Sequence, residues 1–238
     1  MSADAAGRHP GLLAAALARA ESWLLAPAPP KEGIAERASA AGTMRPLIAV
    51  VGLSPGCGAT TVARALAARL AARDPSSAAI VAGPDSAPPF SPVTPAAARL
   101  AKRVGSPVEA AGRLCLAHTD DYAALAVSAR DLAPVVFDVP RDRSPAGAVS
   151  LADLTVLVAP RDAEPALAEL ASRPLERPGR KPLIVANRAA DPSRWKERAQ
   201  LMLPESRAGA RLAAAGWEAR GPLGAAVSRL GEVCEAAA

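Results

Sequence analysis

Residues 47–66 read LIAVVGLSPGCGATTVARAL, and this stretch decides the fold. Its first five residues, Leu47–Val51, are all apolar, which indicates a strand that is buried on both faces. A glycine-containing loop follows, and the chain then enters an alanine-rich helical segment. This order of buried strand, glycine loop and helix is typical of a loop that holds phosphate groups with backbone N–H groups at a helix N-terminus.

The glycine loop departs from the usual phosphate-binding pattern, G-x-x-x-x-G-K-[ST], at one decisive position. Gly58 supplies the last glycine and Thr60 and Thr61 supply hydroxyl groups, but Ala59 stands where the pattern has lysine. That lysine neutralises the β- and γ-phosphates, while the hydroxyl binds Mg²⁺. Pro55 also removes one backbone N–H from the loop. We therefore expect weaker phosphate binding than an intact loop provides.

The length leaves room for one α/β domain, or a small domain plus an extension, and the cysteines indicate a reducing compartment. The chain has 238 residues and is 50% apolar, which is ample for a core. Its three cysteines are widely spaced and fit neither a disulfide framework nor a zinc site, so we predict a cytoplasmic protein. Basic and acidic residues alternate under a mild net charge of +5, which argues against nucleic-acid binding. No apolar run approaches the ~20 residues of a membrane span, and the excess of arginine over lysine indicates a bacterial, GC-rich genome.

The chain is predicted to have two parts. Residues 1–43 combine an amphipathic segment, 12–25, with a proline-rich linker, and we expect this extension to be flexible and to add little to the core. Met44 stands close to the first strand, which makes it an alternative translation start. Residues 44–238 are expected to form the main domain.

Apolar segments alternate with helical segments through the main domain. This alternation predicts a doubly wound α/β fold, with a mostly parallel sheet sandwiched by helices. Capping signals such as Thr119-Asp120-Asp121 and Gly221-Pro222 mark the expected helix starts. A long proline-rich loop, 84–95, follows the second strand. The expected strands are residues 47–51, 78–82, 113–117, 134–139, 155–159 and 182–186.

The order of motifs over residues 45–236 resembles the MinD/ParA family of P-loop ATPases. The family's loop, K-G-G-x-G-K-[ST]-[ST], matches residues 54–61, with Ser54 and Ala59 in place of its two lysines. Its Asp-x-Pro motif matches residues 138–140, its base-contacting Asn matches Asn187, and its Ile-Pro-x-Asp turn matches residues 203–206. The resemblance implies a P-loop NTPase-like fold with a degenerate Walker A loop, which is similar to loops of the TadZ/CpaE branch.

The resemblance also implies ATP and Mg²⁺ as ligands. Thr60 would bind Mg²⁺ directly, and Asp138 would bind it through water. The catalytic residues are unknown, since Asp85 is the one candidate and is displaced from the acid that the family carries after its second strand. We expect a regulatory or positioning protein that binds ATP weakly, hydrolyses it slowly or not at all, and has a protein partner; a homodimer is compatible with this. The implied nucleotide-binding residues are Gly56, Cys57, Gly58, Ala59, Thr60, Thr61, Asn187 and Pro204.

Other interpretations stay open. The sequence is also compatible with a pseudo-ATPase, a scaffold protein that keeps the fold, binds a protein partner and binds no nucleotide. Residues 52–56 also match the G-x-S-x-G nucleophile elbow of hydrolases, with Ser54, Asp85 and His118 in the required order, although Pro55 lacks the N–H that the oxyanion needs. Residues 56–58 begin a dinucleotide-binding fingerprint, but Thr61 stands at its third glycine.

Three further side chains are interpreted as packing residues. Cys57 is expected to fill space in a tight loop rather than to act as a reactive thiol. Trp195 and Trp217 are expected to pack on amphipathic helices, since they lack the basic neighbours of a nucleic-acid stacking platform.

Overall fold

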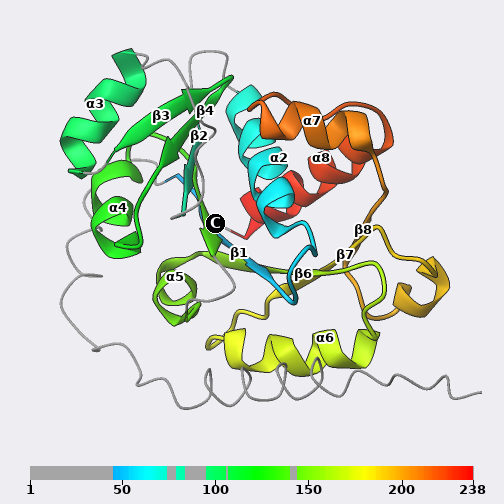
Figure 1. The fold of residues 1–238 in the computed structure, drawn as a ribbon. Helices are drawn as coiled ribbons and strands as arrows, with labels where there is room; N and C mark the ends of the chain where they lie inside the picture. Colours follow the sequence, from blue (N-terminus) through cyan, green and yellow to red (C-terminus); the bar gives the residue numbers. More distant parts are fainter. Residues whose placement is uncertain (1–44, 74–78, 84–94, 106, 140–143, 238) are drawn as a thin grey trace, which may run out of the picture.

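The computed structural model describes residues 45–73, 79–83, 95–105, 107–139 and 144–237. The extension 1–43, Asp85 and most of the loop at 84–95 lie outside the described residues, so the expectations for them stay predictions. Within the described part, an eight-stranded sheet carries helices on both faces (Figure 1). The predicted fold class, a doubly wound and mostly parallel α/β sandwich, is confirmed.

The strands lie in the order β3-β4-β2-β5-β1-β6-β7-β8. Within the described sheet, β3 pairs with β4 in the antiparallel sense and the other neighbours are parallel. The six predicted strands are present, whereas the short edge strands β3 and β8 were not predicted. The strand bounds are β1 Leu47–Gly52, β2 Ala79–Ala82, β3 Val108–Ala111, β4 Leu114–Ala117, β5 Val135–Val139, β6 Leu154–Ala159, β7 Leu183–Asn187 and β8 Leu201–Leu203.

The helices form two layers because alternate strand residues point to opposite faces of the sheet. Helices α2, α7 and α8 cover one face, where α2 packs over β1, β2 and β5, α8 reaches the sheet at β8, and both α7 and α8 contact α2. Helices α3, α4 and α5 cover the other face, which α6 extends over β6 and β7. The helix bounds are α2 Ala59–Ala72, α3 Pro95–Val104, α4 Tyr122–Ala129, α5 Ala146–Leu151, α6 Pro165–Ser172, α7 Arg207–Ala214 and α8 Gly221–Ala236, with 3₁₀ turns at Arg173–Leu175 and Pro192–Trp195.

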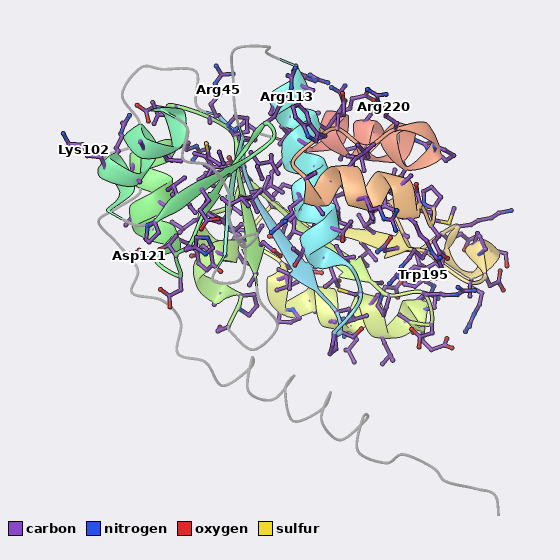
Figure 2. The ribbon with its side chains drawn as sticks, turned by 45° about the horizontal axis from the view of Figure 1, so that its top comes forward. Arg45, Lys102, Arg113, Asp121, Trp195 and Arg220 are labelled. Atoms are coloured by element: carbon purple, nitrogen blue, oxygen red, sulfur yellow. The ribbon has the colours of Figure 1, made fainter. Side chains whose placement is uncertain are left out.

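The predicted helix starts are confirmed by their caps. Asp121, labelled at the start of α4 in Figure 2, accepts a hydrogen bond from the backbone N–H of Ala124 at 2.9 Å. Pro222 occupies the first turn of α8, where a missing N–H costs nothing. Among the described helices, none combines the length and the apolarity that crossing a bilayer requires.

The two tryptophans differ in their surroundings. Trp195 is 2% exposed and packs beside α6, so its packing role is confirmed (Figure 2). Trp217 is 50% exposed and follows the end of α7, so the prediction that it packs on a helix is wrong. Gly216 packs its backbone against the β3–β4 turn, where its carbonyl oxygen accepts the N–H of Arg113 at 2.9 Å, while the indole of the next residue stays half-exposed.

The carboxyl ends of the parallel strands bring the predicted motifs to one edge of the sheet. β1 lies between β5 and β6, with Val50 opposite Asp138, and the glycine loop follows β1 at this edge. Asn187 ends β7 at the same edge. In open α/β sheets, ligands bind in the crevice outside these strand ends.

Two alternatives from the sequence do not match this topology. In the dinucleotide-binding fold the first two strands are neighbours, but here β5 lies between β1 and β2, so that interpretation is wrong. A nucleophile elbow needs a sharp turn from strand to helix, whereas α2 begins only at Ala59, well after Ser54. The structure therefore gives the hydrolase interpretation no support.

A mostly buried ion pair lies at the amino ends of the strands, opposite the glycine loop. The Asp153 carboxylate accepts hydrogen bonds from Nη2 of Arg130 at 2.8 and 2.6 Å. The same carboxylate accepts the backbone N–H of Leu47 at 2.9 Å, so it joins the start of β1 to the segment before β6. This cluster lies at the amino ends of the strands, away from the glycine loop, and we assign it a structural role.

Candidate functional site

The glycine loop presents unpaired backbone N–H groups at the start of α2. Gly58, the N-cap residue directly before α2, has a left-handed backbone conformation with φ +87°, and no side chain caps the first turn of the helix. The N–H groups of Ala59, Thr60 and Thr61 have no acceptor within the described part of the chain. Such N–H groups, together with the positive end of the helix dipole, favour an anion.

Asn187 ties the end of β7 to the glycine loop. Its side-chain Nδ2 donates to the carbonyl oxygen of Cys57 at 2.7 Å, and the residue is 8% exposed. A Cβ at Gly58 would lie 2.4 Å from the same Nδ2, so the close approach requires glycine. The structure thus brings Asn187 to the loop, and its carboxamide oxygen has no partner among the residues that the structure describes.

Cys57 contributes its backbone to the loop, while its side chain fills the space below. The residue is 3% exposed and belongs to the core beneath α2. A Cβ at Gly52 would lie 2.7 Å from Sγ of Cys57, so β1 and the loop are in close contact here. This environment matches the packing role expected from the sequence.

A cavity of about 240 Å³ opens beside the loop, between α2, β7, β8, α7 and α8. Its volume is just below the ~300–1,000 Å³ typical of small-molecule sites, which suits one part of a ligand, such as a flat base. The loop and the end of β7 form its polar side, with Gly56, Gly58, Thr61, Asn187 and Arg188. The apolar side includes Val62, Leu203, Pro204, Leu223 and Val227.

The turn after β8 also lines the cavity. Pro204 lines the cavity, and Ser206 begins α7 by accepting a hydrogen bond from the N–H of Gly209 at 3.0 Å. The predicted residues Gly56, Gly58, Thr61, Asn187 and Pro204 therefore meet around one cavity. Ala59 and Thr60 lie beside it in the first turn of α2, and Thr60 is exposed.

Asp138 is buried under α2 with a cationic neighbour. Asp138 is 8% exposed and Arg64 of α2 is 9% exposed. Burial lowers the pKa of Arg64, and the negative charge of Asp138 opposes that shift, so the two charges lie close together. Nη1 of Arg64 also donates to the carbonyl oxygen of Ala214 at 3.1 Å, at the end of α7. Local sequence patterns gave no sign of this electrostatic interaction between a helix and a strand.

The donor set is compatible in kind with Mg²⁺. The hydroxyl of Thr60 and the carboxylate of Asp138 are hard oxygen ligands, which Mg²⁺ combines with substrate phosphates in nucleotide sites. In the described segments, no cluster of three or more His, Cys, Asp or Glu side chains could hold a metal ion. A metal at this edge would therefore depend on phosphate oxygens for much of its coordination.

Arg188 is the candidate that the sequence analysis did not assign. Its backbone has φ +57°, which is uncommon for a residue other than glycine. Its N–H donates to the carbonyl oxygen of Leu203 at 2.8 Å, and its side-chain Nη2 donates to the carbonyl oxygen of Gly56 at 2.8 Å. The available signal was its place directly after Asn187, at the carboxyl end of a buried strand.

Comparison with known proteins identifies the fold. No protein-family profile and no curated protein matches the sequence. The structure is similar to a ParA family ATPase from Chlorobium tepidum TLS, with a TM-score of 0.56 and 13% identity over 80% of this chain and 99% of that chain. It is also similar to a plasmid partition protein from Borrelia burgdorferi, with a TM-score of 0.47 and 10% identity over 69% of this chain and 91% of that chain. The first of these likenesses shows that the chain has a MinD/ParA-like fold.

Proposed function

We propose, from the MinD/ParA-like fold and the cavity beside the glycine loop, that this protein binds ATP weakly and hydrolyses it slowly or not at all. In this proposal it acts as a regulatory or positioning protein through a protein partner. The observation that carries the proposal is the meeting of the loop, Asn187 and Pro204 around one cavity. A phosphate-binding loop and a base-sized cavity side by side are what a nucleotide requires.

The phosphates would lie over the loop. The unpaired N–H groups of Ala59, Thr60 and Thr61 would donate to phosphate oxygens at the positive end of α2. Ala59 supplies no charge, and the loss of one charge-assisted contact costs about 1.5–3 kcal/mol, or roughly ten- to a hundredfold in affinity. The proposed binding is weak for this reason.

The base would occupy the cavity. Apolar side chains such as Val62 and Leu223 provide flat contact surface, and Pro204 closes one side. The free carboxamide oxygen of Asn187 would accept a hydrogen bond from an exocyclic amino group, which supports adenine. Both contacts are independent of the missing lysine.

The metal would be held by Thr60 and, through water, by Asp138. When bound, Mg²⁺ neutralises phosphate charge and orients the phosphates. Arg64 beside Asp138 already offers that carboxylate a positive neighbour, which lowers its attraction for a second cation. Slow turnover follows, because charge developing on the transferred phosphoryl group would lack both the lysine and a strongly held metal.

The proposed location is the cytoplasm. The three cysteines, Cys57, Cys115 and Cys234, are all buried free thiols in the structure. Unpaired thiols are typical of a reducing compartment.

Calorimetric titration with ATP, with and without Mg²⁺, tests the proposal. Ala210→Leu fills the cavity from α7, whereas Ala208→Leu places the same side chain on the exposed side of the same helix. We expect wild type and Ala208→Leu to bind alike and Ala210→Leu to bind at least tenfold more weakly, since overfilling a site excludes the ligand. Absence of binding to wild type at millimolar ATP would instead favour the scaffold that binds a protein partner without nucleotide.

A further inference from the structure

Arg188 reaches from the end of β7 onto the glycine loop. Its guanidinium donates through Nη2 to the carbonyl oxygen of Gly56 at 2.8 Å, and the residue lines the cavity. The preceding residue, Asn187, holds the next carbonyl of the loop, that of Cys57. The positive charge of Arg188 is therefore fixed at the loop whose N–H groups would face the phosphates.

The guanidinium of Arg188 keeps donors that no protein group uses. A guanidinium has five N–H donors in a planar fork. The Nε atom of Arg188 is buried without an acceptor, and no carboxylate pairs with this arginine among the described residues. Nη1 has no acceptor among the described residues either, so a phosphate oxygen that accepts from the Nη edge of the fork would be stabilising.

Two other arginines in the described structure near the loop are engaged elsewhere. Arg64 donates to the carbonyl oxygen of Ala214 and lies in the field of Asp138. Arg161, at the end of β6, pairs with Glu205 at 3.7 Å and is exposed. Arg188 thus combines contact with the loop, a place in the cavity wall and the lack of an acidic partner in the described structure.

The backbone of Arg188 supports the same assignment. An arginine in the left-handed conformation is strained, and here the N–H bond to Leu203 at 2.8 Å holds it in place. The conformation places the side chain on the loop rather than in line with β7. Strain of this kind is concentrated at ligand sites.

We propose that Arg188 is the phosphate-binding cation of this site and supplies the charge that Ala59 lacks. The ligand class is a nucleoside di- or triphosphate, and the inference in this form rests on the proposed function. A fork of N–H donors binds phosphate oxygens in pairs, so an arginine from a strand end is a chemically adequate substitute for a lysine on the helix.

The test is calorimetric titration of wild type and Arg188→Gln with adenosine, AMP, ADP, ATP and inorganic tripolyphosphate. We expect the loss in Arg188→Gln to grow with phosphate number, from no change for adenosine to roughly ten- to a hundredfold for ATP. Arg161→Gln, a nearby exposed arginine, should bind ATP as wild type does. Adding Ala59→Lys to Arg188→Gln should restore most of the lost ATP affinity.

The possible results distinguish a failure of the Arg188 assignment from a failure of the proposed nucleotide-binding function. Equal ATP binding by wild type and Arg188→Gln, or an equal loss for adenosine and ATP, would overturn the assignment, the latter because it indicates a purely structural role. If wild type binds tripolyphosphate in an Arg188-dependent way but no nucleotide, the proposed function fails and the anion site stands. Binding of neither overturns both. Should Arg188→Gln fail to fold, Arg188→Lys keeps the charge without the fork and should show an intermediate loss for ATP.

Discussion

Two glycines of the loop provide a matched test of the contact between the loop and β7. Gly56 and Gly58 both have left-handed backbones, with φ +69° and +87°. A Cβ at Gly56 would meet nothing within 4 Å, whereas a Cβ at Gly58 would lie 2.4 Å from Nδ2 of Asn187. We predict that Gly58→Ala destabilises the fold clearly more than Gly56→Ala.

The expected difference follows from what each methyl group displaces. Both substitutions force alanine into the left-handed region, at a cost of about 1–2 kcal/mol. In Gly58→Ala the methyl group must also push Asn187 off the carbonyl of Cys57, and leaving a buried polar group unpaired costs a further ~1–3 kcal/mol. The unfolding free energy should therefore fall by about 2–5 kcal/mol for Gly58→Ala and by about 1–2 kcal/mol for Gly56→Ala.

Urea unfolding followed by circular dichroism measures both values. In an Asn187→Ala background the side chain that Gly58→Ala displaces is absent, so the extra cost should disappear and leave the backbone cost alone. Equal costs for the two glycines in the wild-type background, or an extra cost that survives Asn187→Ala, would refute the reasoning. Either result would mean that Asn187 does not hold the loop.

Three further predictions concern the core, a buried thiol and the chemistry. Asp153→Ala leaves the mostly buried Arg130 without its carboxylate partner and should lower the unfolding free energy by about 3–5 kcal/mol. Asp131→Ala breaks the exposed pair with Arg103 and should lower it by about 1 kcal/mol or less. Burial raises the pKa of the Cys234 thiol from 9.0 to about 12. Stability from this group is complete well below pH 9 and is lost as the pH rises toward 12, so between pH 9 and 10 the unfolding free energy of wild type should fall by about 1 kcal/mol more than that of Cys234→Ala. ATP turnover, measured by phosphate release, should lie far below the usual ~1–10³ s⁻¹, and turnover within that range that Asp138→Asn abolishes would contradict the proposal.

The sequence was sufficient for the central sheet because its strands carry their own signal. β1, β5 and β6 are short and almost entirely apolar, and such runs are typical of strands that are buried on both faces of a parallel sheet. β3 and β8 were missed because neither is a buried apolar run: β3 reads VEAA and alternates buried with partly buried residues, and β8 has three residues of which one is buried. Trp217 was misjudged because α7 ends at Ala214, before the tryptophan.

The contacts of the candidate site were harder to predict, because they join distant parts of the chain. The resemblance placed Asn187 near a base, but its bond to Cys57 spans 130 residues and follows from the sheet order. The bond from Arg188 to Gly56 spans 132 residues, and that from Arg64 to Ala214 spans 150. Local periodicity carries no information at such separations, so the cations could be assigned only from the assembled fold.

The missing lysine and the preserved loop have one physical explanation. Backbone N–H groups bind an anion only if the loop keeps its shape, and here that shape is held by the left-handed Gly58, by Asn187 on Cys57 and by Arg188 on Gly56. A lysine at position 59 would add charge on the first turn of α2 without taking part in these contacts. Its loss therefore leaves the loop geometry intact. A charge supplied from β7 is compatible with the same loop. Because Gly58 and the bond from Asn187 to Cys57 remain when that arginine is replaced, phosphate binding should weaken while the loop and the base cavity keep their shape.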